Sequence, residues 1–208
     1  LDLLRDSDRR SRWAFAPTSC AGPSDAAYLI RYAPQLGMHA VASRPLEPGD
    51  VVLLEPPLVS TRSSVAPGLP SNEPEWQLAH ALLTLGARRG WASRFASLTP
   101  TEAHEGTEVS RWLSERHGVP AEVPARLWDA VRGNAFCLET PLLGVEYGAA
   151  FYETAACFNH SCRPNCHSVR LGGNMAVFAC AHIAPGDELR HSCALRPPFA
   201  PHLPPSHT

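Results

Sequence analysis

The sequence predicts an α+β fold in which two groups of short strands flank a helical block. Short apolar runs separated by Pro-Gly turns occur in residues 28–60 and again after Asn134. Between these two regions, apolar residues recur at spacings of three and four, which is the period of a helix that buries one face. Strands and helices that are segregated along the chain in this way are typical of α+β domains, here with an insertion.

The composition fits one large domain. The chain has 208 residues, of which 44% are hydrophobic and 18% are charged, so a substantial core is expected. The net charge of −2 argues against direct nucleic-acid binding, which normally requires a basic surface. We expect no membrane span, because no run of 18 apolar residues occurs, and no signal peptide, because the first ten residues are rich in charge.

The first group of strands follows a lead-in, residues 1–27, that shows no sustained period. Residues 38–42 and 51–55 are apolar runs, and the Pro-Gly turn at residues 45–50 joins them. We therefore expect these two strands to form a unit resembling a β-hairpin. A loop rich in Ser, Pro and Gly follows, at residues 61–74.

Three helices are predicted in the block that follows. The first begins at a cap on Ser71 or Asn72 and buries Trp76 and Leu82; the second begins at Thr99 and ends before Gly118. The third covers residues 124–132. We expect the tryptophans of these helices to be core residues.

The chain returns to short strands after Asn134. Residues 177–181 and 188–191 are predicted strands, and residues 184–187 form the turn between them. The tail from residue 197 is rich in proline and is expected to be disordered.

The most informative string is FNHSCRPNC, at residues 158–166. Its Asn, Ser and Pro residues suit tight turns, whereas Cys162 and Cys166 with His160 and His167 are potential metal ligands. The thiols are not spaced as a CxxC pair, so the spacing alone favours a structural loop. The chain has seven cysteines, an odd number, which favours reduced thiols in the nucleus or cytoplasm over a secreted disulfide framework.

The string NHSCRPN at residues 159–165 resembles the NHSCxPN signature of SET-domain protein-lysine methyltransferases. Four further blocks resemble motifs of this family and occur in the family's order: LGMHAV with PGDVV at 36–52, GNAF at 133–136, GAAFY at 148–152 and ACAHIAPGDEL at 179–189. The layout is most similar to that of the SET-and-MYND (SMYD) group. One such string alone is a weak signal, but five ordered blocks are a strong one.

The resemblance implies a SET-type β-fold of small curved sheets with a C-terminal pseudoknot and a helical insertion. In this fold residues 159–165 and the strand at 188–193 are neighbours, although threading of this kind is rare. The SET domain would then cover residues 28–196. Its N-terminal part is 28–60, the helical insertion is 61–132 and the C-terminal part is 133–196, with a tail at 197–208.

The implied activity is S-adenosylmethionine-dependent methylation of a lysine on a histone or non-histone protein. Lysine titrates near 10.4, so such a site must present a dry, neutral amine. The resemblance places the cofactor-binding groups at Gly37, Asn134, Ala156, Phe158, Asn159 and His160. From the residues alone, Asn134 is also suited to a turn or a helix end, and His160 to a core position.

Three departures from the family pattern bear on activity. The family tyrosine that orients the lysine amine is replaced by Cys193, and Tyr152 or Tyr147 is a candidate to supply a phenol in its place. Leu36 stands where the family has a polar residue. No cysteine lies between Cys20 and Cys137, so the MYND zinc finger is absent, and none follows Cys193. We therefore expect no structural zinc.

Two alternatives to the enzyme remain. One is a catalytically weak or inactive SET module that serves as a protein-interaction domain, which the replacement of the tyrosine by Cys193 suggests. The other is a zinc-binding interaction module that uses Cys157, Cys162, Cys166 and Cys180. It ranks lower because these cysteines are not spaced as CxxC pairs.

Overall fold

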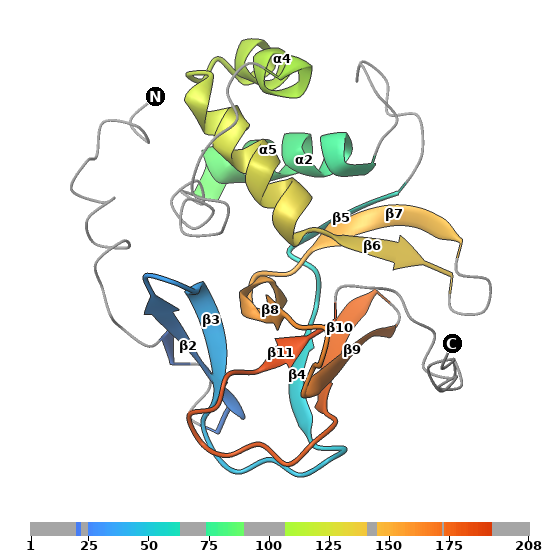
Figure 1. The fold of residues 1–208 in the computed structure, drawn as a ribbon. Coiled ribbons are helices and arrows are strands. Elements are labelled where there is room, and N and C mark those ends of the chain that lie inside the picture. The colour runs from blue at the N-terminus through green and yellow to red at the C-terminus, as the bar shows by residue number, and fades with distance from the viewer. Residues whose placement is uncertain are drawn as a thin grey trace, which may run out of the picture.

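The computed structural model describes residues 20–21, 25–62, 74–89, 107–140, 145–171 and 173–192. In this part of the chain the helices gather on one side of the molecule and most of the strands on the other (Figure 1). The strands form three sheets of three strands and one of two strands. This mixed architecture confirms the predicted α+β class.

The sheets combine strands from both ends of the chain. The first has the order β1-β2-β3 and the second the order β4-β10-β9. Their strands are β1 (Cys20–Ala21), β2 (Tyr28–Ala33), β3 (Gly37–Ala42), β4 (Val51–Glu55), β9 (Cys166–Leu171) and β10 (Asn174–Ala179). The third has the order β5-β7-β6, and β8 pairs with β11. Their strands are β5 (Val59–Arg62), β6 (Phe136–Glu139), β7 (Glu146–Phe151), β8 (Asn159–His160) and β11 (Arg190–His191).

The described part of the insertion contains three helices, namely α2 (Pro74–Arg89), α4 (Glu108–His117) and α5 (Glu122–Asn134). The side chain of Thr107 caps the start of α4 by accepting a bond from the Ser110 amide, and Gly118 ends the helix in the left-handed conformation, with φ of 62°. The indole of Trp76 packs edge-on against those of Trp112 and Trp128, at centroid distances of 6.3 and 6.2 Å. Trp76 of α2 and Trp128 of α5 are buried, so the prediction that they belong to the core is confirmed. Trp112 of α4 is half-buried. No helix in the described ranges has the length and hydropathy needed to cross a bilayer.

The expected hairpin between residues 38–42 and 51–55 is wrong, although both strands exist. β3 pairs with β2, a strand that the pattern did not single out, and β4 pairs with β10. The intervening turn is held instead by the C-terminal region, because Leu46 exchanges backbone bonds with Ile183 and the Gly49 amide donates to Ala179. The two strands therefore diverge into different sheets.

Several other boundaries can be compared. The third helix begins two residues earlier and ends two residues later than predicted. The predicted strand at 177–181 overlaps the end of β10, which begins three residues earlier and stops at Ala179. The predicted caps at Ser71 and Asn72, the start of the second helix at Thr99, most of the lead-in and the tail lie outside the described residues. So does Cys193.

Candidate functional site

The C-terminal segment, residues 186–191, passes between β3 and the loop at residues 159–165. On one side the amide of Leu189 donates to Ala40, at 2.8 Å, and that of Ala42 donates to Asp187, at 2.9 Å. On the other side β11 pairs in parallel with β8, with His191 opposite His160. Figure 1 shows β11 lying beside β8, between β3 and β4. The predicted pseudoknot is thus confirmed.

Side-chain amides fasten this threaded segment. The Nδ2 of Asn165 donates to the carbonyl of Glu188 and its Oδ1 accepts from the amide of Arg190, both at 2.8 Å. This side chain therefore pairs with the segment as a neighbouring strand would. The Nδ2 of Asn159 donates to Oε1 of Glu188, also at 2.8 Å.

A short 3₁₀ helix, η1 (Ala155–Cys157), precedes β8 and packs against β3. The carboxylate of Glu55, at the end of β4, accepts bonds from the amides of Thr154 and Ala155, at 2.8 and 2.9 Å. Burial raises the pKa of Glu55, although these two bonds act to lower it. Glu55 thus fixes the start of the segment that carries Ala156 and Phe158.

His191 is a second polar residue that the sequence did not single out. Only 2% of it is exposed, and its ring lies 5.7 Å from that of Phe136 and 6.5 Å from that of Phe158. Its Nδ1 is hydrogen-bonded to the hydroxyl of Ser168, at 3.1 Å. Burial, more than the nearby His160, lowers the pKa of His191 to about 4, so the imidazole is neutral at pH 7.

The β3–β8–β11 junction is the place where β8 pairs with β11 beside β3, and Phe158, Asn159 and His160 of the predicted cofactor residues lie at it. Phe158, Asn159 and His160 are consecutive, and they run from a buried ring to an exposed imidazole. Gly37 begins β3, the strand that packs on η1, with φ of 68°. Asn134 ends α5, where its Nδ2 donates to the Ala130 carbonyl, at 2.9 Å.

The two predicted catalytic positions are Cys193 and Tyr152. Cys193 follows the last described residue. Tyr152 is fully buried, and its phenol donates to the carbonyl of Gly173. Its ring also packs edge-on against Phe136, at 5.6 Å. These contacts give Tyr152 a packing role, and its catalytic role stays a prediction.

The cysteines named for the alternative zinc module do not converge. Cys157 and Cys166 are buried, whereas Cys162 and Cys180 are exposed, and no three metal-binding atoms of this set lie together within the described residues. The described ranges contain one other compact group of donor atoms, those of Cys137, Glu139 and Glu146, within 4.8 Å of one another. Burial, followed by the neighbouring carboxylates, raises the pKa of the Cys137 thiol to about 12.

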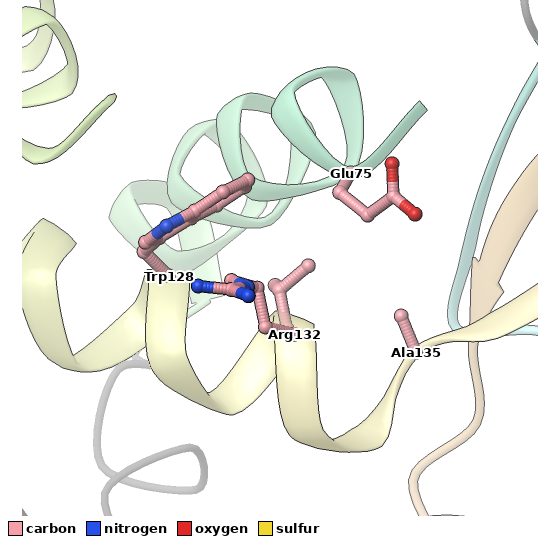
Figure 2. A pocket seen from close by; sticks show the side chains of 5 residues that line it. Glu75, Trp128, Arg132 and Ala135 are labelled. Carbon is pink, nitrogen blue, oxygen red and sulfur yellow. The ribbon is translucent and has the colours of Figure 1, made fainter. Parts of the chain in front are cut away.

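A hollow of about 410 Å³ lies between α2 and α5. Figure 2 shows Glu75 of α2 on one side of it, with Trp128 and Arg132 of α5 on the other. None of the predicted cofactor residues lines this hollow, although Asn134 stands beside it in the sequence, immediately before Ala135. The hollow and the β3–β8–β11 junction are therefore different features of the surface.

Two solved structures of LSMT resemble this chain in fold. The SET domain of LSMT bound to lysine and AdoHcy matches with a TM-score of 0.55 and 13% identity, over 91% of this chain and 54% of that one. Rubisco LSMT bound to AdoMet matches with a TM-score of 0.55 and 12% identity, over 91% and 53%. The chain thus spans about half the length of these proteins, and at such identities the likeness establishes the fold.

A comparison of the sequence with curated proteins finds no match. The sequence model of the SET domain family, in contrast, matches residues 37–194. That range begins at Gly37, includes β8 and β11, and spans the whole pseudoknot. The chain belongs to the SET domain family.

Proposed function

We propose that this chain transfers a methyl group from S-adenosylmethionine to the side chain of a lysine in a protein, histone or non-histone. The observation that carries the proposal is the pseudoknot, which brings residues 159–161 against β11 and β3 against η1. The solved proteins of similar fold support it, because they bind AdoMet, or lysine with AdoHcy.

The residues at the junction suit an adenosine-containing cofactor. Within the described residues β8 pairs with β11 only. This short strand and the residue before it present the buried ring of Phe158, the half-buried Asn159 and the exposed His160. An apolar wall with a few polar groups is typical of small-molecule sites. We propose that Gly37, Asn134 and Ala156 complete this site.

S-adenosylmethionine, when bound, supplies a methyl group on a positively charged sulfur. The protein must keep the lysine amine neutral, and a desolvated site lowers the pKa of lysine from about 10.4. Phe136, Phe158 and the neutral His191 form an apolar, uncharged region beside β11. A protonated His191 would add a positive charge to this region, which would disfavour a cationic cofactor there, so its lowered pKa is compatible with this chemistry.

A second candidate function is a SET module that binds proteins with weak or no turnover. It is favoured by Cys193, which stands where the family has a tyrosine and offers only a weak S–H donor in place of a phenol. We further propose a nuclear or cytoplasmic location, which is supported by the reduced state of the five cysteines whose side chains the structure describes.

Calorimetry with S-adenosylmethionine and radiolabelled methyl transfer to a lysine peptide library test the two candidates. We expect binding, and we expect His160→Ala to weaken it without lowering the melting temperature, because this side chain is exposed. His167→Ala, which removes an exposed imidazole from β9, is the matched control. Methyl transfer by the wild type supports the enzyme. If the wild type binds the cofactor without transferring the methyl group, and Cys193→Tyr restores the transfer, the inactive module is supported. Absence of binding would contradict the proposal.

A further inference from the structure

Two histidines of the insertion, far apart in the sequence, meet between two helices. His80 lies on α2 and His117 is the last residue of α4. The Nδ1 of His80 and the Nε2 of His117 are 2.9 Å apart, although 37 residues separate them. Both side chains are partly buried, and the ring of His80 packs edge-on against Trp112, at a centroid distance of 5.6 Å.

The distance between these nitrogen atoms fits two adjacent ligands of one ion. Imidazole nitrogens bind first-row metals at about 2.0–2.1 Å. Two such ligands at right angles are about 2.9 Å apart, whereas two ligands of a tetrahedron are about 3.3–3.4 Å apart. The observed 2.9 Å therefore matches a right-angled pair. Square-planar and tetragonal sites of nitrogen and oxygen are characteristic of Cu²⁺ and Ni²⁺.

We propose that His80 and His117 form a two-histidine site for a divalent transition-metal ion of tetragonal preference, with Cu²⁺ bound most tightly. The order of affinities among divalent first-row metals places Cu²⁺ above Ni²⁺ and Zn²⁺. Because no third His, Cys, Asp or Glu joins the pair within the described residues, water would fill the remaining positions. The bound ion would fasten α2 to α4.

The surroundings of the two imidazoles disfavour their protonated forms. Burial, followed by the charge of Arg116, lowers the pKa of His80. Burial, followed by His80 and Arg116, lowers the pKa of His117. A metal ion binds only the unprotonated nitrogen. The 2.9 Å distance between the two nitrogens, rather than their protonation, is what points to a metal site. In the absence of an ion the same nitrogens share one hydrogen bond, which holds them close together.

The position of Trp112 provides a direct readout. Cu²⁺ quenches indole fluorescence at short range, and Trp112 contacts His80. We expect Cu²⁺ added to tag-free protein to quench the emission with a stoichiometry of one ion. Trp112→Phe should remove most of the quenching and keep the binding. The electron paramagnetic resonance spectrum of the bound Cu²⁺ should show coupling to two imidazole nitrogens.

Substitutions separate a metal site from a hydrogen bond between helices. His80→Ala and His117→Ala should each lower the Cu²⁺ affinity by about tenfold or more. His117→Gln retains a hydrogen-bonding group, so it should lose the metal and keep the helical circular dichroism. His182→Ala is the control, since this exposed histidine pairs with Glu47 on the opposite part of the fold. Unchanged affinity in His80→Ala and His117→Gln would overturn the proposal and leave the pair as a structural hydrogen bond.

Discussion

Replacement of Asn165 by alanine should loosen the threaded C-terminal segment. The change removes two hydrogen bonds of 2.8 Å, one to the carbonyl of Glu188 and one from the amide of Arg190. A typical bond contributes about 0.5–1.5 kcal/mol, and a partner left unsatisfied adds to the loss. The residue between the two partners, Leu189, is fully buried, so water reaches this segment poorly. We therefore expect a loss of about 2–3 kcal/mol in the free energy of unfolding.

This loss corresponds to a fall of about 5–10 °C in melting temperature for a chain of this size. Urea denaturation followed by circular dichroism measures the free energy of unfolding, and a melting curve measures the temperature. Asn165→Asp keeps the acceptor and loses the donor, so it should fall between the wild type and Asn165→Ala. The matched control is Asn174→Ala, which removes the same amide from a half-buried position at the start of β10. If Asn165→Ala were as stable as this control, the amide would not fasten the pseudoknot.

Three further changes test the elements around the junction. Glu55→Ala removes both acceptors at the start of η1, so it should lower the free energy of unfolding, measured by urea denaturation, by about 2–3 kcal/mol. It should also weaken the cofactor affinity measured by calorimetry. His191 has a folded-state pKa of about 4, below its unfolded value near 6.5. Its contribution to the free energy of unfolding should therefore be complete above about pH 6.5 and fall progressively toward pH 4. His191→Gln should flatten this part of the stability profile, and an unchanged profile would count against the burial of a neutral imidazole. Gly148→Ala would place a Cβ 2.0 Å from the carbonyl oxygen of Thr61, so it should disrupt the pairing of β5 with β7, whereas Gly118→Ala, at an open turn, should cost only about 1 kcal/mol.

The sequence predicts the fold well where the signals are local. The apolar run at residues 51–55 is β4, and Gly118 ends α4 because its left-handed conformation suits glycine. The motif at residues 159–165 also predicts the position of the threaded strand. Local signals do not, however, specify partners. β3 and β4 are adjacent in the sequence, yet they join different sheets, because β3 pairs with β2 and β4 pairs with β10, which lies more than 100 residues further along the chain.

The polar contacts of the site are harder to predict for the same reason. Glu55 follows an apolar run and bonds to the start of η1, about 100 residues away. His191 reads as an ordinary strand residue, and only the pairing of β11 with β8 shows that its ring is buried against Phe136 and Phe158. The pair formed by His80 and His117 has no spacing signal, since two helices must pack before the rings meet. Each of these contacts depends on tertiary structure.

The central claim is that the β3–β8–β11 junction holds S-adenosylmethionine. A crystal structure of the chain with S-adenosylhomocysteine, the product form of this cofactor, tests the claim most directly. We predict that the ligand contacts Gly37, Phe158, Asn159 and His160, with its sulfur directed toward the end of β11. A ligand bound instead in the hollow between α2 and α5, or no ligand at a saturating concentration, would contradict the account.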